Sequence, residues 1–69
     1  MNLPMYILLK KKAEAVQRRN HFDSLYNDLQ DKARTDEQHR LLKYYKDMRE
    51  VYFKKSREIT LIIYRKIFS

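Results

Sequence analysis

The sequence contains no cysteine, no glycine and no tryptophan, and proline occurs only once. Without cysteine the chain can form neither disulfide bonds nor thiolate metal sites, and nothing in it points to an oxidising compartment. Tight β-hairpin turns usually require glycine, so its absence argues against a fold built from hairpins of strands. Alanine, leucine, lysine, arginine, glutamate and glutamine are plentiful, and all of them favour helix. We therefore expect an all-α protein.

The chain has 69 residues, which allows one domain at most. A chain this short buries a small share of its surface and is marginally stable alone. Small scaffolds are usually stabilised by disulfides, a metal, oligomerisation or close helix packing. Two histidines do not make a metal site, and we expect no metal or other cofactor. Packing and oligomerisation remain, so we expect a homodimer.

The second half of the chain carries the clearest helical pattern. Apolar residues recur there at steps of three, four or seven, which places them on one side of a helix: Leu41, Tyr45, Met48, Tyr52, Ile59 and Ile63. Thr35 and Gln38 are spaced as in a capping box, which marks a helix N-terminus. Asp36 and Glu37 follow Thr35, where the helix dipole favours negative charge. We predict a helix over about 36–67.

The first half shows alternating steps of three and four along a second series: Met5, Leu8, Lys12, Ala15, Arg19, Phe22, Tyr26, Leu29 and Ala33. Such a series predicts one long helix over about 4–33 with a coiled-coil-like seam, followed by a turn at about 34–36. The pattern is weakest at residues 19–24. A break there would give three helices instead of two, but we favour the continuous helix.

A chain that folds back at Thr35 brings together residues whose numbers add up to about 70. The apolar ends of the two patterns then coincide. The stretches around Ala15 and Ser56, where each pattern has few large apolar residues, also coincide, and we call them the thin regions. We therefore predict an antiparallel two-helix hairpin that forms a single domain over residues 1–69. Two helices make a poor core, so we expect the hairpin to dimerise into a four-helix bundle. The alternative is a strand at residues 59–68, which are rich in β-branched and aromatic side chains.

Surplus apolar residues gather at the end of the hairpin opposite the turn, which we call the open end. These residues lie off the predicted seam and are candidates for an oligomer or partner interface: Tyr6, Ile7, Leu61, Tyr64, Ile67 and Phe68. A helix that is apolar nearly all round must bury more than one face. We therefore expect the open end to be covered by a second copy of the chain or by a partner protein.

The formal net charge is +7 and the pI is about 9.8. Such a charge favours nucleic acid, an anionic membrane surface or an acidic protein as the partner. The hairpin pairing gathers eight bases into a predicted belt between an acidic turn and the apolar open end: Lys10, Lys11, Lys12, Arg18, Arg19, Lys54, Lys55 and Arg57. Phe53 lies within this belt and is expected to face outward, where its ring could stack on an unpaired base.

The chain shows no phosphate-binding loop, no cluster of metal ligands and no nucleophile motif, so we expect no enzymatic activity and no small-molecule substrate. The first hypothesis is a small regulatory protein that binds nucleic acid through phosphate contacts of the belt. The second is a regulator, inhibitor or assembly factor that docks its open end on a partner protein. The third is attachment to a membrane surface. The apolar run Met5–Leu9 precedes its positive charges, unlike a signal peptide, and we expect a cytoplasmic protein.

Overall fold

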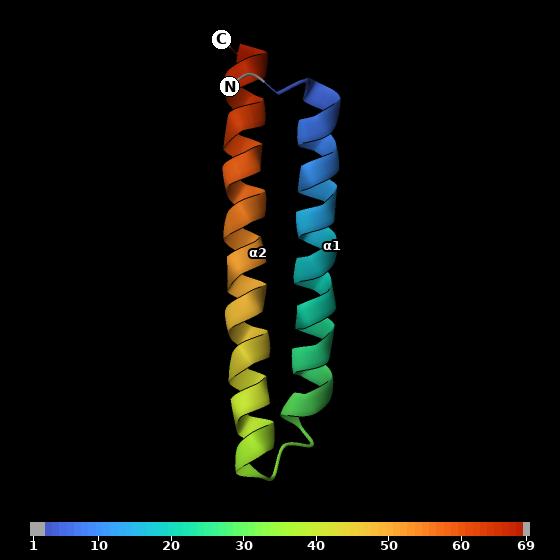
Figure 1. The fold of residues 1–69 in the computed structure, drawn as a ribbon, viewed down its shortest axis with the longest axis vertical. Helices are drawn as coiled ribbons and strands as arrows, with labels where there is room; N and C mark the ends of the chain where they lie inside the picture. The colour runs from blue at the N-terminus through green and yellow to red at the C-terminus, as the bar shows by residue number, and fades with distance from the viewer. Residues whose placement is uncertain (1–2, 69) are drawn as a thin grey trace.

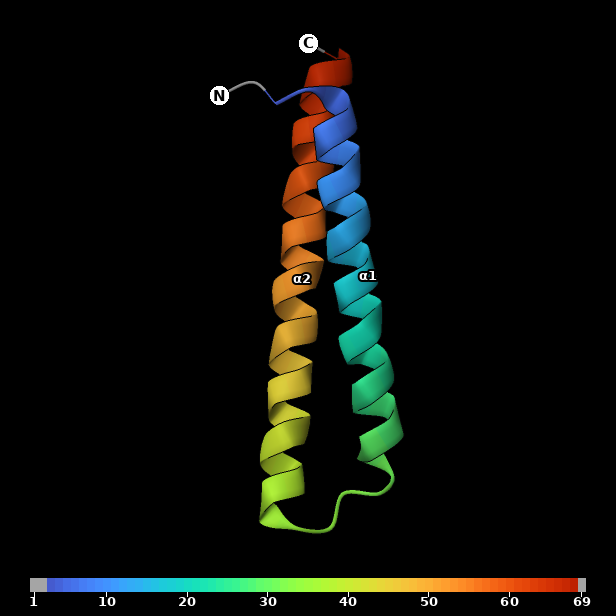
Figure 2. The ribbon, with the colours of Figure 1, turned by 45° about the vertical axis from the view of Figure 1, so that its right-hand side comes forward.

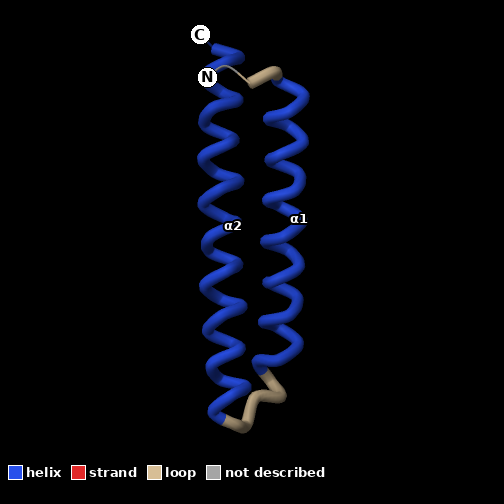
Figure 3. The backbone as a smooth tube through the Cα atoms, in the orientation of Figure 1, coloured by secondary structure: helices blue, strands red, loops and turns tan. Residues whose placement is uncertain are grey.

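The computed structural model describes residues 3–68, which form two helices (Figures 1 and 3). Helix α1 spans Met5–Gln30 and helix α2 spans Asp36–Phe68. The helices pack antiparallel along their whole length, and the start of α1 lies beside the end of α2 in both ribbon views (Figures 1 and 2). The all-helical hairpin is therefore confirmed. Its backbone measures 51 × 17 × 13 Å.

Both of the alternative secondary structures are wrong. Helix α1 runs without interruption through residues 19–24, so the chain forms two helices there and not three. Residues 59–68 belong to α2, and no strand occurs among the described residues 3–68. The periodic spacing of Ile59 and Ile63 therefore outweighed the local preference of β-branched residues for strands.

The turn between the helices is longer than predicted. Helix α1 ends at Gln30 instead of about residue 33, and the connection covers residues 31–35. The predicted capping box is present, because Thr35 Oγ1 accepts a hydrogen bond from the Gln38 N–H at 3.2 Å and Gln38 Oε1 accepts one from the Thr35 N–H at 3.1 Å. Gln38 Oε1 also accepts the Arg34 N–H at 2.8 Å. These N–H groups therefore point toward α2 and cannot extend α1.

Contacts between the helices confirm the predicted register. The Arg18 guanidinium donates a hydrogen bond to the Tyr52 hydroxyl at 3.1 Å, and the Phe22 ring stacks on the Tyr52 ring with centroids 5.9 Å apart. Nearer the turn, Arg49 forms an ion pair with Asp23 at 2.8 Å. At the open end, Lys66 Nζ donates to the Leu3 carbonyl. Each of these pairs follows from folding the chain back at Thr35.

Full burial is confined to a few positions in the open half of the hairpin. The buried apolar side chains are Leu8, Ala15 and Ile63, with relative exposures of 1%, 6% and 8%. Ser56 is also buried, and its hydroxyl donates to the Phe53 carbonyl. Ala15 and Ser56 are the small residues at the thin region of the two patterns, where they allow the helices to approach closely. Nearly all other members of the two predicted series are half-buried.

The hairpin leaves an unusually large surface exposed. Its accessible area is 5823 Å², whereas a compact monomer of the same mass would expose about 4,700 Å². The difference of about 1,100 Å² reflects the elongated shape and the shortage of buried side chains. Eleven large apolar side chains are exposed among the described residues, so a pair of helices alone does not cover the apolar surface that this sequence provides.

The capping box makes a testable contribution to stability. Replacing Thr35 by Ala removes the side-chain acceptor for the Gln38 N–H, and we expect a loss of about 1 kcal/mol in the free energy of unfolding. Urea titration followed by circular dichroism measures this loss. Thr35→Ser keeps the acceptor and should unfold near the wild-type midpoint. An unchanged midpoint for Thr35→Ala would show that the box does not stabilise the turn.

Two adjacent leucines provide a matched test of the core. Leu8 is 1% exposed and Leu9 is 52% exposed. Leu8→Ala should cost about 2–5 kcal/mol, because it removes buried methyl groups and leaves a cavity. Leu9→Ala makes the same chemical change and should cost less than about 1 kcal/mol. Thermal unfolding of both variants checks the expectation, and equal losses would contradict the placement of Leu8 in the core.

Candidate binding surfaces

Three of the eight predicted belt residues surround one shallow hollow on the surface. Lys11 and Arg18 from α1 and Lys55 from α2 line it together with Tyr52. Glu14 is the one acidic side chain in its lining, so the hollow is cationic. Residues Lys11 and Arg18 are seven apart, or nearly two helical turns, which places both on the same side of α1.

Tyr52 organises the cations of this hollow. Its hydroxyl accepts the hydrogen bond from Arg18, while the Arg18 guanidinium carbon lies 5.6 Å and Lys55 Nζ lies 5.2 Å from the ring centroid. Cations are attracted to the negative face of an aromatic ring. The hydrogen bond to Tyr52 is the main reason that the pKa of Arg18 is raised above its ordinary value. The same hydrogen bond holds Arg18 toward α2.

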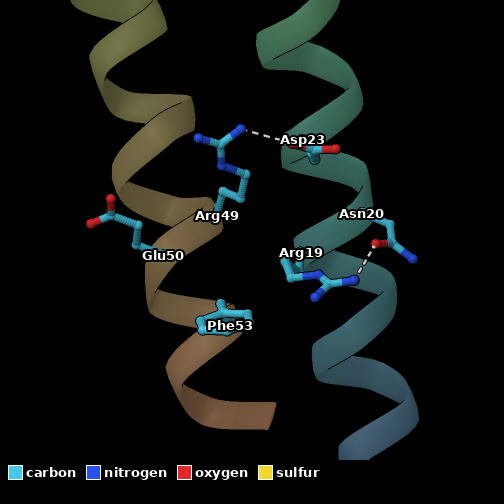
Figure 4. Close-up of a pocket in the computed structure, with 6 residues that line it drawn as sticks. All are labelled: Arg19, Asn20, Asp23, Arg49, Glu50 and Phe53. Atoms are coloured by element: carbon cyan, nitrogen blue, oxygen red, sulfur yellow. Dashed lines mark hydrogen bonds and ion pairs between the residues drawn. The ribbon is translucent and has the colours of Figure 1, made fainter. Parts of the chain in front are cut away.

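A second hollow, shown in Figure 4, has Phe53 in its lining. Because Phe53 and Lys55 point about 200° apart on α2, the two hollows lie on opposite sides of the hairpin. Arg49 reaches across from α2 to the Asp23 carboxylate at 2.8 Å, and its guanidinium carbon lies 4.7 Å from the centroid of the Tyr26 ring. Arg19 donates to the Asn20 side chain at 3.1 Å, and its guanidinium carbon lies 5.9 Å from the centroid of Phe53. The Arg49–Asp23 pair is partly exposed, so its contribution to stability is about 0.2–1 kcal/mol.

Two of the remaining basic residues, Lys10 and Lys54, do not share a face with either hollow. Phe53 and Lys55 line hollows on opposite sides, and successive residues of a helix point about 100° apart. Lys54, which lies between them in the sequence, must therefore project away from α1. The same argument places Lys10 on the outer side of α1. The predicted belt thus encircles the hairpin and does not form a single basic face.

Most of the net positive charge lies toward the open end of the hairpin, and not in its middle as the predicted belt implied. The open third of the hairpin, residues 3–13 and 59–68, contains five bases and no acid. The rest of the chain supplies the remaining two units of the net charge of +7. The three consecutive residues Lys10–Lys12 therefore lie next to the apolar open end. Positive charge and exposed apolar surface coincide there.

The predicted open-end residues are exposed, with one exception. Ile7 is half-buried, while the other five have large exposed side chains: Tyr6 at 72%, Leu61 at 51%, Tyr64 at 55%, Ile67 at 58% and Phe68 at 78%. The rings of Tyr64 and Phe68 stack with centroids 6.0 Å apart. An exposed apolar cluster of this kind is a common mark of an interaction site.

Three exposed residues that belong with this cluster were missed by the sequence analysis. Leu9 is 52% and Ile62 is 43% exposed, and Phe53, although correctly predicted to face outward, was assigned to the basic belt. Phe53 and Ile67 are two heptads apart and therefore lie on the same side of α2. Extending the helical spacing from Ile67 toward the middle of the chain would have linked Phe53 to the open end.

Neither helix is both long and apolar enough to cross a bilayer. Within residues 3–68, no group of three or more histidine, cysteine or acidic side chains is placed so that it could hold a metal ion.

Comparison with protein families, with curated proteins and with solved structures found no match for this chain.

Proposed function

We propose that this chain is a non-enzymatic binding protein that docks its open end on a partner protein, as a regulator or an assembly factor would. The observation that supports the proposal best is the exposure of five large apolar side chains, Tyr6, Leu61, Tyr64, Ile67 and Phe68, at one end of a hairpin that buries very little. Surface clusters of this size are costly in water unless a partner covers them.

The energy available for such binding is substantial. A standard protein interface removes about 800 Å² from each partner, and the hairpin exposes about 1,100 Å² more than a compact monomer of its mass. Aromatic residues are the side chains that most often dominate binding energy at interfaces. Tyr6, Tyr64 and Phe68 place three of them at the open end. Partner binding would complete a core that the hairpin lacks.

Site-specific photo-crosslinking in the native cells tests this proposal. A benzophenone side chain in place of Tyr64 should give a discrete protein adduct, whereas the same group in place of Asn27, which is exposed near the turn, should not. Ile67→Glu should abolish the adduct, because it introduces a charge into the apolar contact. Gln30→Glu adds the same charge near the turn and should leave the adduct intact. Equal labelling from both ends of the hairpin would contradict the proposal.

Nucleic-acid binding is the second candidate, and the cationic hollow supports it. Lys11, Arg18 and Lys55 converge there from both helices around Tyr52, and one phosphate group would suit three converging cations. Phosphate contacts of this type give affinity without sequence preference. Function through the hollow would not require the exposed side chains of the open end, so the two candidates are separable by mutation.

Charge-matched triple variants distinguish a specific hollow from general basicity. Replacing Lys11, Arg18 and Lys55 by Gln should weaken binding to a mixed single-stranded oligonucleotide about tenfold or more at low salt, and should reduce the slope of log K against log salt by about 2. Replacing Lys10, Lys43 and Lys54 removes the same charge from outer faces and should have a smaller effect. Fluorescence anisotropy measures both. Equal effects, or no binding by the wild type, would rule out the hollow as a phosphate site.

A further inference from the structure

One side of α2 carries an unpartnered apolar stripe that reaches from the middle of the hairpin to the open end. Phe53, Tyr64 and Ile67 lie at spacings of eleven and three residues, which keeps them on one side of the helix. Their side chains are 48%, 55% and 58% exposed. Thr60 falls between them and is half-buried, with its hydroxyl bonded to the Ser56 carbonyl. The stripe extends over about 21 Å at 1.5 Å per residue.

Helix α1 contributes a parallel stripe on the same side of the hairpin. Leu9, Val16 and Asp23 are spaced by seven residues and therefore share one side of α1. Asp23 and Phe53 line the same hollow (Figure 4), so both stripes face the same way. Leu9 is 52% exposed and Val16 is half-buried. The two stripes flank the line along which α1 and α2 meet on this side of the open half, and we call this strip of surface the groove.

The groove is flanked by cations and lacks acids along most of its length. Lys12 and Arg19 follow the α1 stripe, and Arg57 lies between Phe53 and Tyr64 at helical spacing. Two acids, Asp23 and Glu50, line the hollow on this side, and both lie at the end of the groove nearer the turn. Asp23 is held by Arg49 at 2.8 Å, and Figure 4 shows Glu50 projecting away from α1. A partner for this surface should therefore combine apolar side chains with negative charge.

The length of the groove suits a helix. A strip of surface about 21 Å long between two antiparallel helices accommodates about four turns of a third helix.

We propose that the groove bordered by Leu9, Val16, Phe53, Tyr64 and Ile67 binds an acidic amphipathic helix of another protein, which packs against α1 and α2 as a third helix. The apolar face of the partner helix covers the two stripes, and its acidic flanks pair with Lys12, Arg19 and Arg57. This inference rests on the proposed function, because it specifies the chemical class of the partner at the open end. It excludes a basic helix and a second copy of this cation-rich end.

Synthetic peptides test the class of partner. A series of 18-residue peptides would present Leu and Ile at heptad spacing with Glu at the flanking positions, and a matched series would carry Lys at those positions. We expect the Glu series to bind with a Kd below about 100 µM and to gain helix on binding, as circular dichroism would show. The Lys series should bind at least about tenfold more weakly, and high salt should remove most of the difference.

Variants of the hairpin locate the binding site. Arg57→Gln with Lys12→Gln should weaken the Glu peptides about tenfold, and Ile67→Glu should abolish their binding. Lys10→Gln with Lys54→Gln removes the same charge from outer faces and should change Kd less than about threefold. Binding that is equal for the two peptide series, absent for the Glu series or equally weakened by the outer pair would overturn the inference. A crosslinked partner whose contact segment is not acidic would do the same while leaving the proposed function intact.

Discussion

Two packed helices can bury only one stripe of each, and this geometric limit governs the whole molecule. In α1 and α2 the stripe yields three buried apolar residues, Leu8, Ala15 and Ile63. The aromatic residues nearer the turn, such as Phe22 and Tyr52, pack on each other but remain half-buried. Because folding must offset a large loss of conformational entropy, a hairpin with so small a core is expected to be marginally stable. Any surface that a partner covers therefore adds to its stability as well as to its function.

The fold could be predicted from the sequence because its main determinants are local. The steps of three, four and seven along the chain specify which side of each helix faces the other, and the capping box of Thr35 and Gln38 specifies where α2 begins. The length of the turn could not be predicted in the same way. It depends on a hydrogen bond from the Arg34 N–H to Gln38 that is not part of the usual capping pattern. Because the Arg34 N–H bonds to the Gln38 side chain, it does not continue the hydrogen bonding of α1, which ends at Gln30.

The candidate sites were harder to predict, because a charge count along the sequence ignores the direction of each side chain. Lys10, Lys11 and Lys12 are adjacent in the sequence but point to different sides of α1, and of these three only Lys11 lines the cationic hollow. Lys54 and Lys55 diverge in the same way. Conversely, Phe53 and Ile67 are distant in the sequence and share one side of α2. The correct grouping follows from applying the helical period to charged and exposed residues as strictly as to the core.

The coincidence of positive charge and apolar surface at the open end gives the molecule its polarity. The turn carries acids that interact favourably with the N-terminus of α2, such as Asp36 and Glu37, whereas the open third carries five bases and no acid. Exposed apolar groups supply most of the affinity in an interface, and the surrounding charges supply selectivity and speed of association. A hairpin with uniform charge would bind apolar partners without discrimination. Under the proposed function, the five bases around Tyr64 and Ile67 would select acidic partners over basic ones.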